Sequence, residues 1–102
     1  MAADMQAMRI DLLLGPGMNI QRDPMCGRNF EYFSEDPLIS GKMASAMVRG
    51  LQSLPGGGGC IKHYAANNQE TNRNAVDSVI GQRALREIYL EPYKIAIQES
   101  QP

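Results

Sequence analysis

The pattern that most constrains this chain is a pair of short apolar runs, each followed by a long polar stretch, with a helical pattern between them. Residues 10–14 are mainly hydrophobic without alternation and end at Gly15-Pro16-Gly17, which predicts a strand covered on both faces. Residues 60–65 predict a second strand. The order strand, loop, helix, strand, loop, helix is the repeating unit of a parallel α/β architecture.

The helix expected between the strands has clear start and stop signals. Asp36 can accept hydrogen bonds from the first backbone N–H groups, and Pro37 suits the first helical position because it has no N–H to lose. Pro55 and the glycines at 56–59 end the pattern, and we expect these glycines to form a flexible turn. Helical spacing predicts one buried apolar stripe, made of Ile39, Met43, Met47, Leu51 and Leu54.

Helical segments are also expected near the two ends of the chain. Residues 2–9 are compatible with the end of a helix. Leu85, Ile88 and Tyr89 recur at helical spacing before Pro92, which we expect to start a further helix. The apolar stripe of that last helix is predicted to contain Tyr93, Ala96 and Ile97.

The two predicted strands cannot close a sheet by themselves. An open pair leaves unpaired backbone edges and uncovered apolar faces. We therefore interpret residues 1–102 as a fragment of a larger domain, and the sequence makes no prediction of localisation.

Composition argues against several classes of partner. The 11 acidic and 10 basic residues nearly cancel, so no strong field favours nucleic acid or an anionic membrane as a partner. The apolar runs are far shorter than the ~20 residues of a membrane-spanning helix. Cys26, Cys60 and one histidine are too few for a structural zinc site, so we expect free thiols, no metal and no cofactor.

Polar side chains that could carry chemistry gather after the predicted strands. In a (β/α) barrel the active site is built from the loops at the carboxyl ends of the strands. Loops of this length inside a compact domain are usually functional or disordered. The candidates are Arg22, Asp23, Arg28, Asn29, Glu31, Glu35 and Asp36 after the first strand, and Lys62, His63, Asn67, Asn68, Gln69, Glu70 and Arg73 around the end of the second.

Three motifs follow one another along the chain. The first motif has two parts: residues 14–20 read Leu-Gly-Pro-Gly-Met-Asn-Ile, and residues 27–37 read Gly-Arg-Asn-Phe-Glu-Tyr-Phe-Ser-Glu-Asp-Pro. The second motif, residues 62–71, begins Lys-His-Tyr. The third, residues 83–90, reads Arg-Ala-Leu-Arg-Glu-Ile-Tyr-Leu. In this order they resemble the first barrel loop, the Lys-His strand end and the following helix of family 3 β-glucosidases. The resemblance implies an α/β fold, a partial (β/α)8 TIM barrel of about two βα units with long loops after each strand.

The resemblance also implies contacts with a substrate. Arg28, Lys62, His63 and Arg73 match family positions that hydrogen-bond the hydroxyls of the sugar in the subsite where the bond is cut. Cationic donors suit this task, since charge-assisted hydrogen bonds are roughly twice as strong as neutral ones. Without the resemblance, ion-paired surface charges would be the favoured interpretation of the arginines and Lys62, and a packing or polar-network role that of His63.

Lys62 and His63 impose a geometric condition on this interpretation. Adjacent residues of a regular strand point to opposite faces of the sheet. Both side chains can therefore reach one sugar only if the backbone departs from regular β geometry at this point.

No residue of the chain is predicted to be catalytic. Retaining glycosidases use two carboxyl groups ~5 Å apart. Glu35 and Asp36 are neighbours that diverge at a helix start, and Asp36 already caps the helix. In the family the nucleophile lies in a Ser-Asp-Trp motif, and this sequence contains no Trp. The further acidic candidates, which lie outside any such motif, are Glu31, Glu70, Asp77 and Glu87.

The leading hypothesis is that residues 1–102 form part of a retaining β-glucosidase that hydrolyses terminal β-D-glucosyl residues, and that they contribute its glucose-binding subsite. The expected partners are a β-glucoside or oligosaccharide substrate, the remainder of the barrel and a second domain. The chain alone is expected to be inactive. The alternatives are a non-catalytic carbohydrate-binding protein and a truncated product without function.

Overall fold

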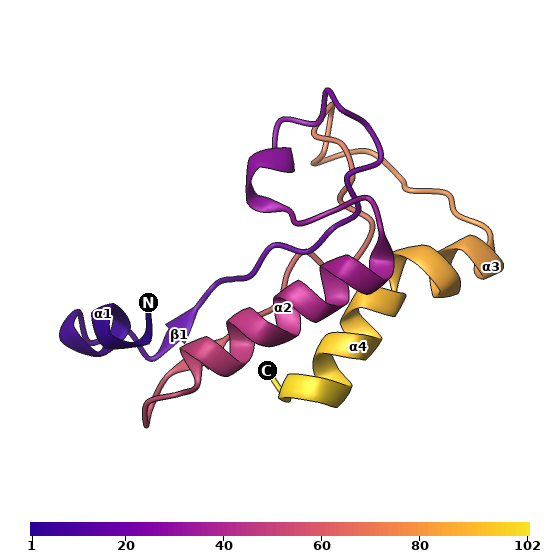
Figure 1. Cartoon of the computed structure of the whole chain (residues 1–102). Coiled ribbons are helices and arrows are strands. Elements are labelled where there is room, and N and C mark those ends of the chain that lie inside the picture. Colours follow the sequence, from indigo (N-terminus) through magenta and orange to yellow (C-terminus); the bar gives the residue numbers. More distant parts are fainter.

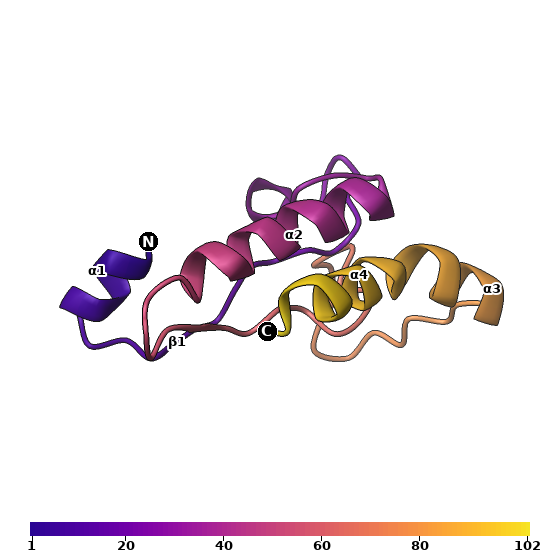
Figure 2. The same ribbon diagram turned by 60° about the horizontal axis from the view of Figure 1, so that its bottom comes forward.

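The computed structural model describes all 102 residues, and its fold is α/β, with two short parallel strands and a set of helices. The elements are α1 (Ala2–Ala7), β1 (Leu12–Leu13), the 3-10 helix η1 (Asn29–Glu31), α2 (Pro37–Leu51), β2 (Gly58–Gly59), α3 (Gln82–Ala84), the π-helix η2 (Leu85–Tyr89) and α4 (Glu91–Ser100) (Figure 1). Helices α2 and α4 lie against each other (Figure 2). None of the helices has the length and apolar character needed to cross a membrane.

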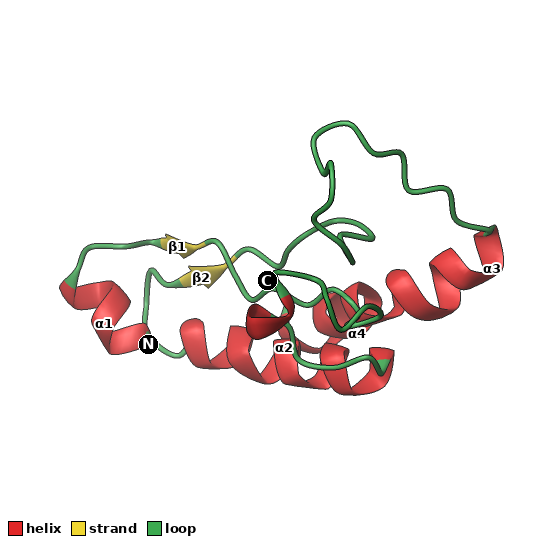
Figure 3. Cartoon of the chain, turned by 90° about the horizontal axis from the view of Figure 1, so that it is seen from above, coloured by secondary structure: helices red, strands yellow, loops and turns green.

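The two strands pair in parallel (Figure 3). The register places Leu12 opposite Gly58 and Leu13 opposite Gly59. Strand β1 is shorter than the predicted run of residues 10–14, and its side chains are not covered on both faces as expected. Leu12 is 54% exposed and Leu14 is 68% exposed, because no other element of this chain lies over them.

Strand β2 lies inside the glycine run and not at residues 60–65, so the prediction of a flexible turn at these glycines is wrong for its last two members. The reason is the close approach of the backbone at Gly59. A Cβ atom there would lie 3.2 Å from the carbonyl oxygen of Gly15 and 3.3 Å from Leu51 Cδ1. Glycine therefore lets the strand run this close both to the first strand segment and to α2 without displacing either.

The start of α2 is confirmed. Asp36 is the N-cap, and its Oδ1 atom accepts hydrogen bonds from the backbone N–H groups of Leu38 at 2.7 Å and Ile39 at 3.1 Å. Pro37 occupies the first turn, as the sequence predicts. The helix ends at Leu51, a few residues before the Pro-Gly run.

The buried face of α2 is not the predicted stripe. Ile39 is 51% exposed and Met43 is 49% exposed, and only Leu51 of the predicted set is fully buried. The buried residues of α2 are mainly small, namely Ser40, Gly41, Ala44, Ser45, Val48 and Leu51. A Cβ atom on Gly41 would lie 2.8 Å from Ile95 Cβ. The close contact between the two helices therefore selects the face with the smallest side chains, and the larger apolar residues point outward.

Helix α4 begins beside Pro92, as expected, and continues the π-helix η2. Tyr93 and Ala96 are buried, whereas Ile97 is 55% exposed and Ile95 is buried in its place. The predicted stripe is therefore correct at two positions and wrong at the third. The cause is the same contact, because the side chain of Ile95 fills the space left by Gly41 on α2.

A small core joins the helices to the first loop. Its buried members are Met18, Ala44, Tyr93 and Ala96. Phe33 and Ile61, both partly buried, pack around this cluster. The core therefore anchors the residues that directly follow the two strands.

We expect Gly41→Ala to destabilise the chain even though alanine favours helices. The added Cβ would overlap with Ile95, and overpacking of this kind costs about 1–3 kcal/mol. Gly50→Ala is the matched control, because Gly50 lies in the same helix and nothing is within 4 Å of the added Cβ. That variant should gain about 0.5–1 kcal/mol. Urea unfolding followed by circular dichroism measures both, and equal effects of the two substitutions would contradict the packing.

Candidate functional site

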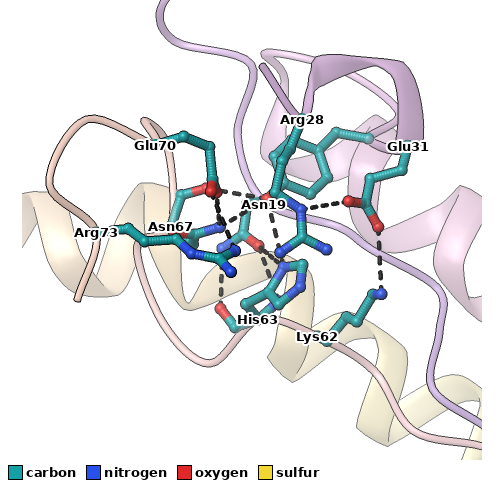
Figure 4. A network of polar contacts seen from close by, with 9 residues as sticks. Asn19, Arg28, Glu31, Lys62, His63, Asn67, Glu70 and Arg73 are labelled. Carbon is teal, nitrogen blue, oxygen red and sulfur yellow. Dashed lines mark hydrogen bonds and ion pairs between the residues drawn. The ribbon is translucent and has the colours of Figure 1, made fainter. Parts of the chain in front are cut away.

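The carboxyl ends of β1 and β2 bring two long segments together. Pairing continues beyond the strands, because Gly17 and Lys62 form an isolated parallel bridge. Lys62 N donates to Pro16 O at 3.0 Å, and Met18 N donates to Lys62 O at 2.8 Å. The side chains that follow form one polar network (Figure 4), which consists of Asn19, Arg28, Glu31, Tyr32, Lys62, His63, Asn67, Glu70 and Arg73.

Glu31 lies between two cations of this polar network. Its carboxylate accepts a hydrogen bond from Arg28 Nε, and it lies 3.3 Å from Lys62 Nζ. The hydrogen bond from Arg28 holds the pKa of Glu31 below its ordinary value, and Lys62 acts in the same direction. Glu31 is therefore ionised at neutral pH and fixes the positions of both cations.

Arg28 and Lys62 keep hydrogen-bond donors for a ligand. A guanidinium group has five N–H donors and an ammonium group has three. In Arg28 only Nε is hydrogen-bonded within the chain, and Lys62 Nζ contacts only Glu31. Both cations are thus ion-paired with Glu31, which is the alternative to sugar contact, but these ion pairs leave most of their N–H donors unused. The site can bind a ligand that is rich in oxygen acceptors.

His63 is held by its backbone as well as by its ring. The side-chain amide of Asn19 donates to His63 O at 2.9 Å and accepts from His63 N at 2.8 Å. The ring lies edge-on to Tyr32, whose hydroxyl is 3.3 Å from His63 Nδ1. Burial lowers the pKa of His63, and the charges of Arg28 and Lys62 lower it further. His63 is therefore neutral at neutral pH.

The backbone around Lys62 and His63 departs from regular β geometry, which is the condition for both side chains to reach one ligand. Strand β2 has already ended, and the peptide bonds Lys62–His63 and Tyr64–Ala65 are cis. Lys62 points to Glu31 and His63 contacts Tyr32, which is the next residue of the same loop. Both side chains thus reach one small region.

Arg73 joins the polar network from its outer edge. Its Nη1 atom donates to Glu70 at 3.1 Å, and Glu70 accepts a second hydrogen bond from Asn67 Nδ2 at 2.9 Å. Asn67 in turn accepts from the Tyr32 hydroxyl through its carbonyl oxygen at 3.1 Å. The side chain of Arg73 is 53% exposed. The structure thus joins Arg28 and Lys62 through Glu31 and places His63 near enough to feel both charges. It links Arg73 to this group through Glu70, Asn67 and Tyr32.

The acidic residues of the two loops have structural partners. Glu31 and Glu70 are ion-paired, and Asp36 caps α2. Glu35 is exposed and accepts a hydrogen bond only from the neighbouring Ser34. No group of three or more His, Cys, Asp or Glu side chains is positioned to hold a metal ion.

Sequence reasoning missed two members of the polar network. Asn19 and Tyr32 lie in the motifs at residues 14–20 and 27–37, but the sequence pattern gives them no role. Nor does it predict that Glu31 and Glu70 hold cations in place. For Asn19 the sequence does hold a signal, because a polar residue two positions after the Gly-Pro-Gly that closes a strand lies at the carboxyl end of the sheet. Nothing in the spacing indicated that it would bind the backbone of His63.

Comparison with known proteins shows the family of this chain. The sequence profile of the Glycosyl hydrolase family 3 N terminal domain matches residues 1–101. This chain belongs to the N-terminal domain of glycosyl hydrolase family 3. Its relatives in that family are glycoside hydrolases, as the following examples show.

Three proteins illustrate the relationship. The chain is 60% identical over 97 residues to a β-glucosidase of Ruminococcus albus, an alignment that covers 95% of this chain and 10% of the relative. It is 48% identical over 102 residues to an exo-alpha-(1->6)-L-arabinopyranosidase of Bifidobacterium longum, covering 100% of this chain and 13% of that protein. The structure of β-glucosidase 3B from Thermotoga neapolitana in complex with glucose matches with 57% identity and a TM-score of 0.96, over 100% of this chain and 14% of that chain. This chain therefore spans only a small part of each relative.

The pKa of Glu31 predicts a pH dependence of stability. Because this pKa is lower in the folded state than the ordinary value of 4.5, the ion pairs stabilise the fold above about pH 4.5 and are lost as the pH falls through the lower folded-state pKa. The free energy of unfolding should therefore fall on acidification below pH 4.5, and less steeply in Glu31→Gln.

Glu87→Gln provides the matched control, because Glu87 is 61% exposed and pairs with Arg83 on the same helical surface. It should keep the wild-type slope between about pH 4.5 and pH 2.5. Urea denaturation at each pH gives the slopes. A Glu31→Gln slope equal to that of the wild type would show that the pKa of Glu31 is not lowered by Arg28 and Lys62.

Proposed function

We propose that this chain is part of a (β/α)8 barrel in a retaining β-glucosidase and that it binds the terminal glucosyl ring of the substrate. The observation that carries the proposal is the convergence of Arg28, Lys62 and His63 at the carboxyl ends of two parallel strands. Barrel enzymes bind their substrates at this end. Family membership and the glucose complex of a protein 57% identical to this chain support the proposal.

Each residue has a role that suits its chemistry. Arg28 and Lys62 donate charge-assisted hydrogen bonds to hydroxyl oxygens of the ring. Glu31 keeps both cations in place and neutralises part of their positive charge. The site therefore does not favour anions over a neutral sugar. His63 contacts a further hydroxyl, and Arg73 supplies a donor from the exposed edge of the polar network.

The nucleophile and the acid/base lie outside residues 1–102 in this proposal. A retaining glycosidase needs two carboxyl groups ~5 Å apart, and the one that acts as general acid needs a raised pKa. The pKa of Glu31 is shifted in the opposite direction, and Glu70 is engaged by Arg73 and Asn67. The chain alone is therefore expected to be inactive.

The remainder of the barrel is the partner that covers the exposed apolar residues. Leu12 and Leu14 on the first strand segment and Ile39 and Met43 on α2 are all about half exposed or more. These residues lie on the two kinds of element, strand and helix, that neighbouring βα units cover in a barrel. A second domain completes the site in the parent protein.

A chimera tests the proposed role. This chain would replace the matching segment of the Thermotoga neapolitana β-glucosidase 3B, which it covers along its whole length at 57% identity. In the chimera, Arg28→Ala and Lys62→Ala should each lower kcat/KM for an aryl β-D-glucoside by roughly 10- to 100-fold. Hydrogen bonds to charged groups contribute about 1.5–3 kcal/mol, which corresponds to that range.

Arg83→Ala is the control for these variants, because the side chain of Arg83 is 88% exposed and pairs only with Glu87. It should leave kcat/KM unchanged. An Arg28→Ala chimera with full activity would contradict the sugar-binding role. Turnover by the isolated chain that depends on Arg28 would contradict the placement of the catalytic carboxylates elsewhere.

A further inference from the structure

Asn19 is a buried side chain whose orientation is fully determined. It is 3% exposed, its Nδ2 atom donates to His63 O at 2.9 Å, and its Oδ1 atom accepts from His63 N at 2.8 Å. A backbone N–H can only donate and a backbone carbonyl can only accept. The nitrogen and oxygen of this amide therefore cannot be exchanged without losing both hydrogen bonds.

The same orientation determines where the imidazole hydrogen of His63 lies. Asn19 Oδ1 is 3.2 Å from His63 Nδ1 and can only accept. The Tyr32 hydroxyl is 3.3 Å from the same nitrogen, but it donates its single hydrogen to Asn67 O at 3.1 Å. Neither neighbour has a hydrogen to give, so Nδ1 must be the donor. In a neutral imidazole the lone pair then lies on Nε2.

The surroundings of His63 favour the neutral ring. Burial and the cations Arg28 and Lys62 disfavour its protonated form, and Glu31 and Glu70 oppose them with smaller effects. Nε2 makes no hydrogen bond within the chain, whereas Nδ1 has two partners. One ring nitrogen is thus committed to the protein, and the other is left as an acceptor.

We propose that Asn19 is a positioning residue that locks His63 in the Nδ1–H tautomer, so that Nε2 accepts a hydrogen bond from a hydroxyl of the ligand. This inference rests on the proposed function for the identity of the ligand. Arg28 and Lys62 require acceptor atoms, whereas His63 requires an O–H donor. A hydroxyl group can satisfy both kinds of partner, while an ether, a fluorine or an anionic oxygen can only accept. The site therefore selects ligands with free hydroxyls.

The tautomer can be measured directly, because His63 is the single histidine of the chain. Long-range 1H–15N correlation spectra of the full 102-residue chain report both ring nitrogens without further assignment. At about pH 7.5, above the ordinary pKa of histidine, Nδ1 should appear as a protonated nitrogen and Nε2 as an unprotonated one. The Nε2–H form, or the mixture shown by free histidine, would overturn the proposal.

Three variants test the part played by Asn19. Asn19→Ala removes the acceptor and should shift the population toward Nε2–H. Asn19→Asp keeps an acceptor oxygen and should retain Nδ1–H, while the added negative charge should raise the pKa of His63. Asn68→Ala is the control, since Asn68 is equally buried at 3% exposure but donates to Ile20 O. An unchanged tautomer in Asn19→Ala would overturn the positioning role.

Addition of glucose separates this inference from the proposed function. A change of the Nε2 resonance with little change at Nδ1 supports both. The Nδ1–H form without any response to glucose upholds the role of Asn19 and counts against glucose binding. A response confined to Nδ1 would overturn the assignment of Nε2 as the ligand acceptor.

Discussion

The short parallel bridge between Gly17 and Lys62 is the contact on which the rest of the site depends. It extends the pairing of β1 and β2 into the loops, and it uses backbone atoms alone. Glycine suits this position, because a Cβ atom on Gly17 would lie 3.0 Å from Glu31 Oε2 and 3.2 Å from the Tyr32 ring, and both side chains would have to shift. The bridge therefore sets the two loops at the separation at which Glu31 reaches Lys62 and Tyr32 reaches His63.

The helices support this arrangement from behind. Met18 follows Gly17 directly and packs in the core against Ala44 and Tyr93. The hydroxyl of Tyr93 accepts a hydrogen bond from Asn19 at 3.4 Å, and burial raises the pKa of Tyr93 far above its ordinary value. Tyr93 is therefore protonated at neutral pH. One side chain of α4 thus belongs both to the apolar core and to the polar site, so the packing of α4 on α2 helps to position Asn19.

The sequence predicts those features that depend on local chemistry. The start of α2 follows from the capping ability of Asp36 and the fixed backbone of Pro37, and the order of strands, loops and helices follows from apolar spacing. Arg28, Lys62 and His63 lie in motifs that resemble a known family, and the structure places them in one polar network. Their contact with a sugar stays a prediction.

The features that could not be predicted depend on how closely segments approach one another. The buried face of α2 is set by the close contact of Gly41 with Ile95. Small side chains are buried there, whereas hydrophobicity alone predicts burial of Ile39 and Met43. The position of β2 is set by the space around Gly59. The role of Asn19 depends on a backbone 44 residues away in the sequence. The periodicity of apolar residues in a sequence does not give the distances between segments that are far apart in the chain.

The open strand pair and its exposed leucines have a practical consequence for work on this chain in solution. Both outer edges of the pair lack a neighbouring strand, and unpaired N–H and C=O groups beside exposed apolar side chains are a template for intermolecular pairing. Cys60 directly follows β2 and is exposed, so copies that associate through this edge would also bring free thiols close to one another. Low protein concentration would disfavour such pairing, and a reducing buffer would prevent disulfide bonds between paired copies.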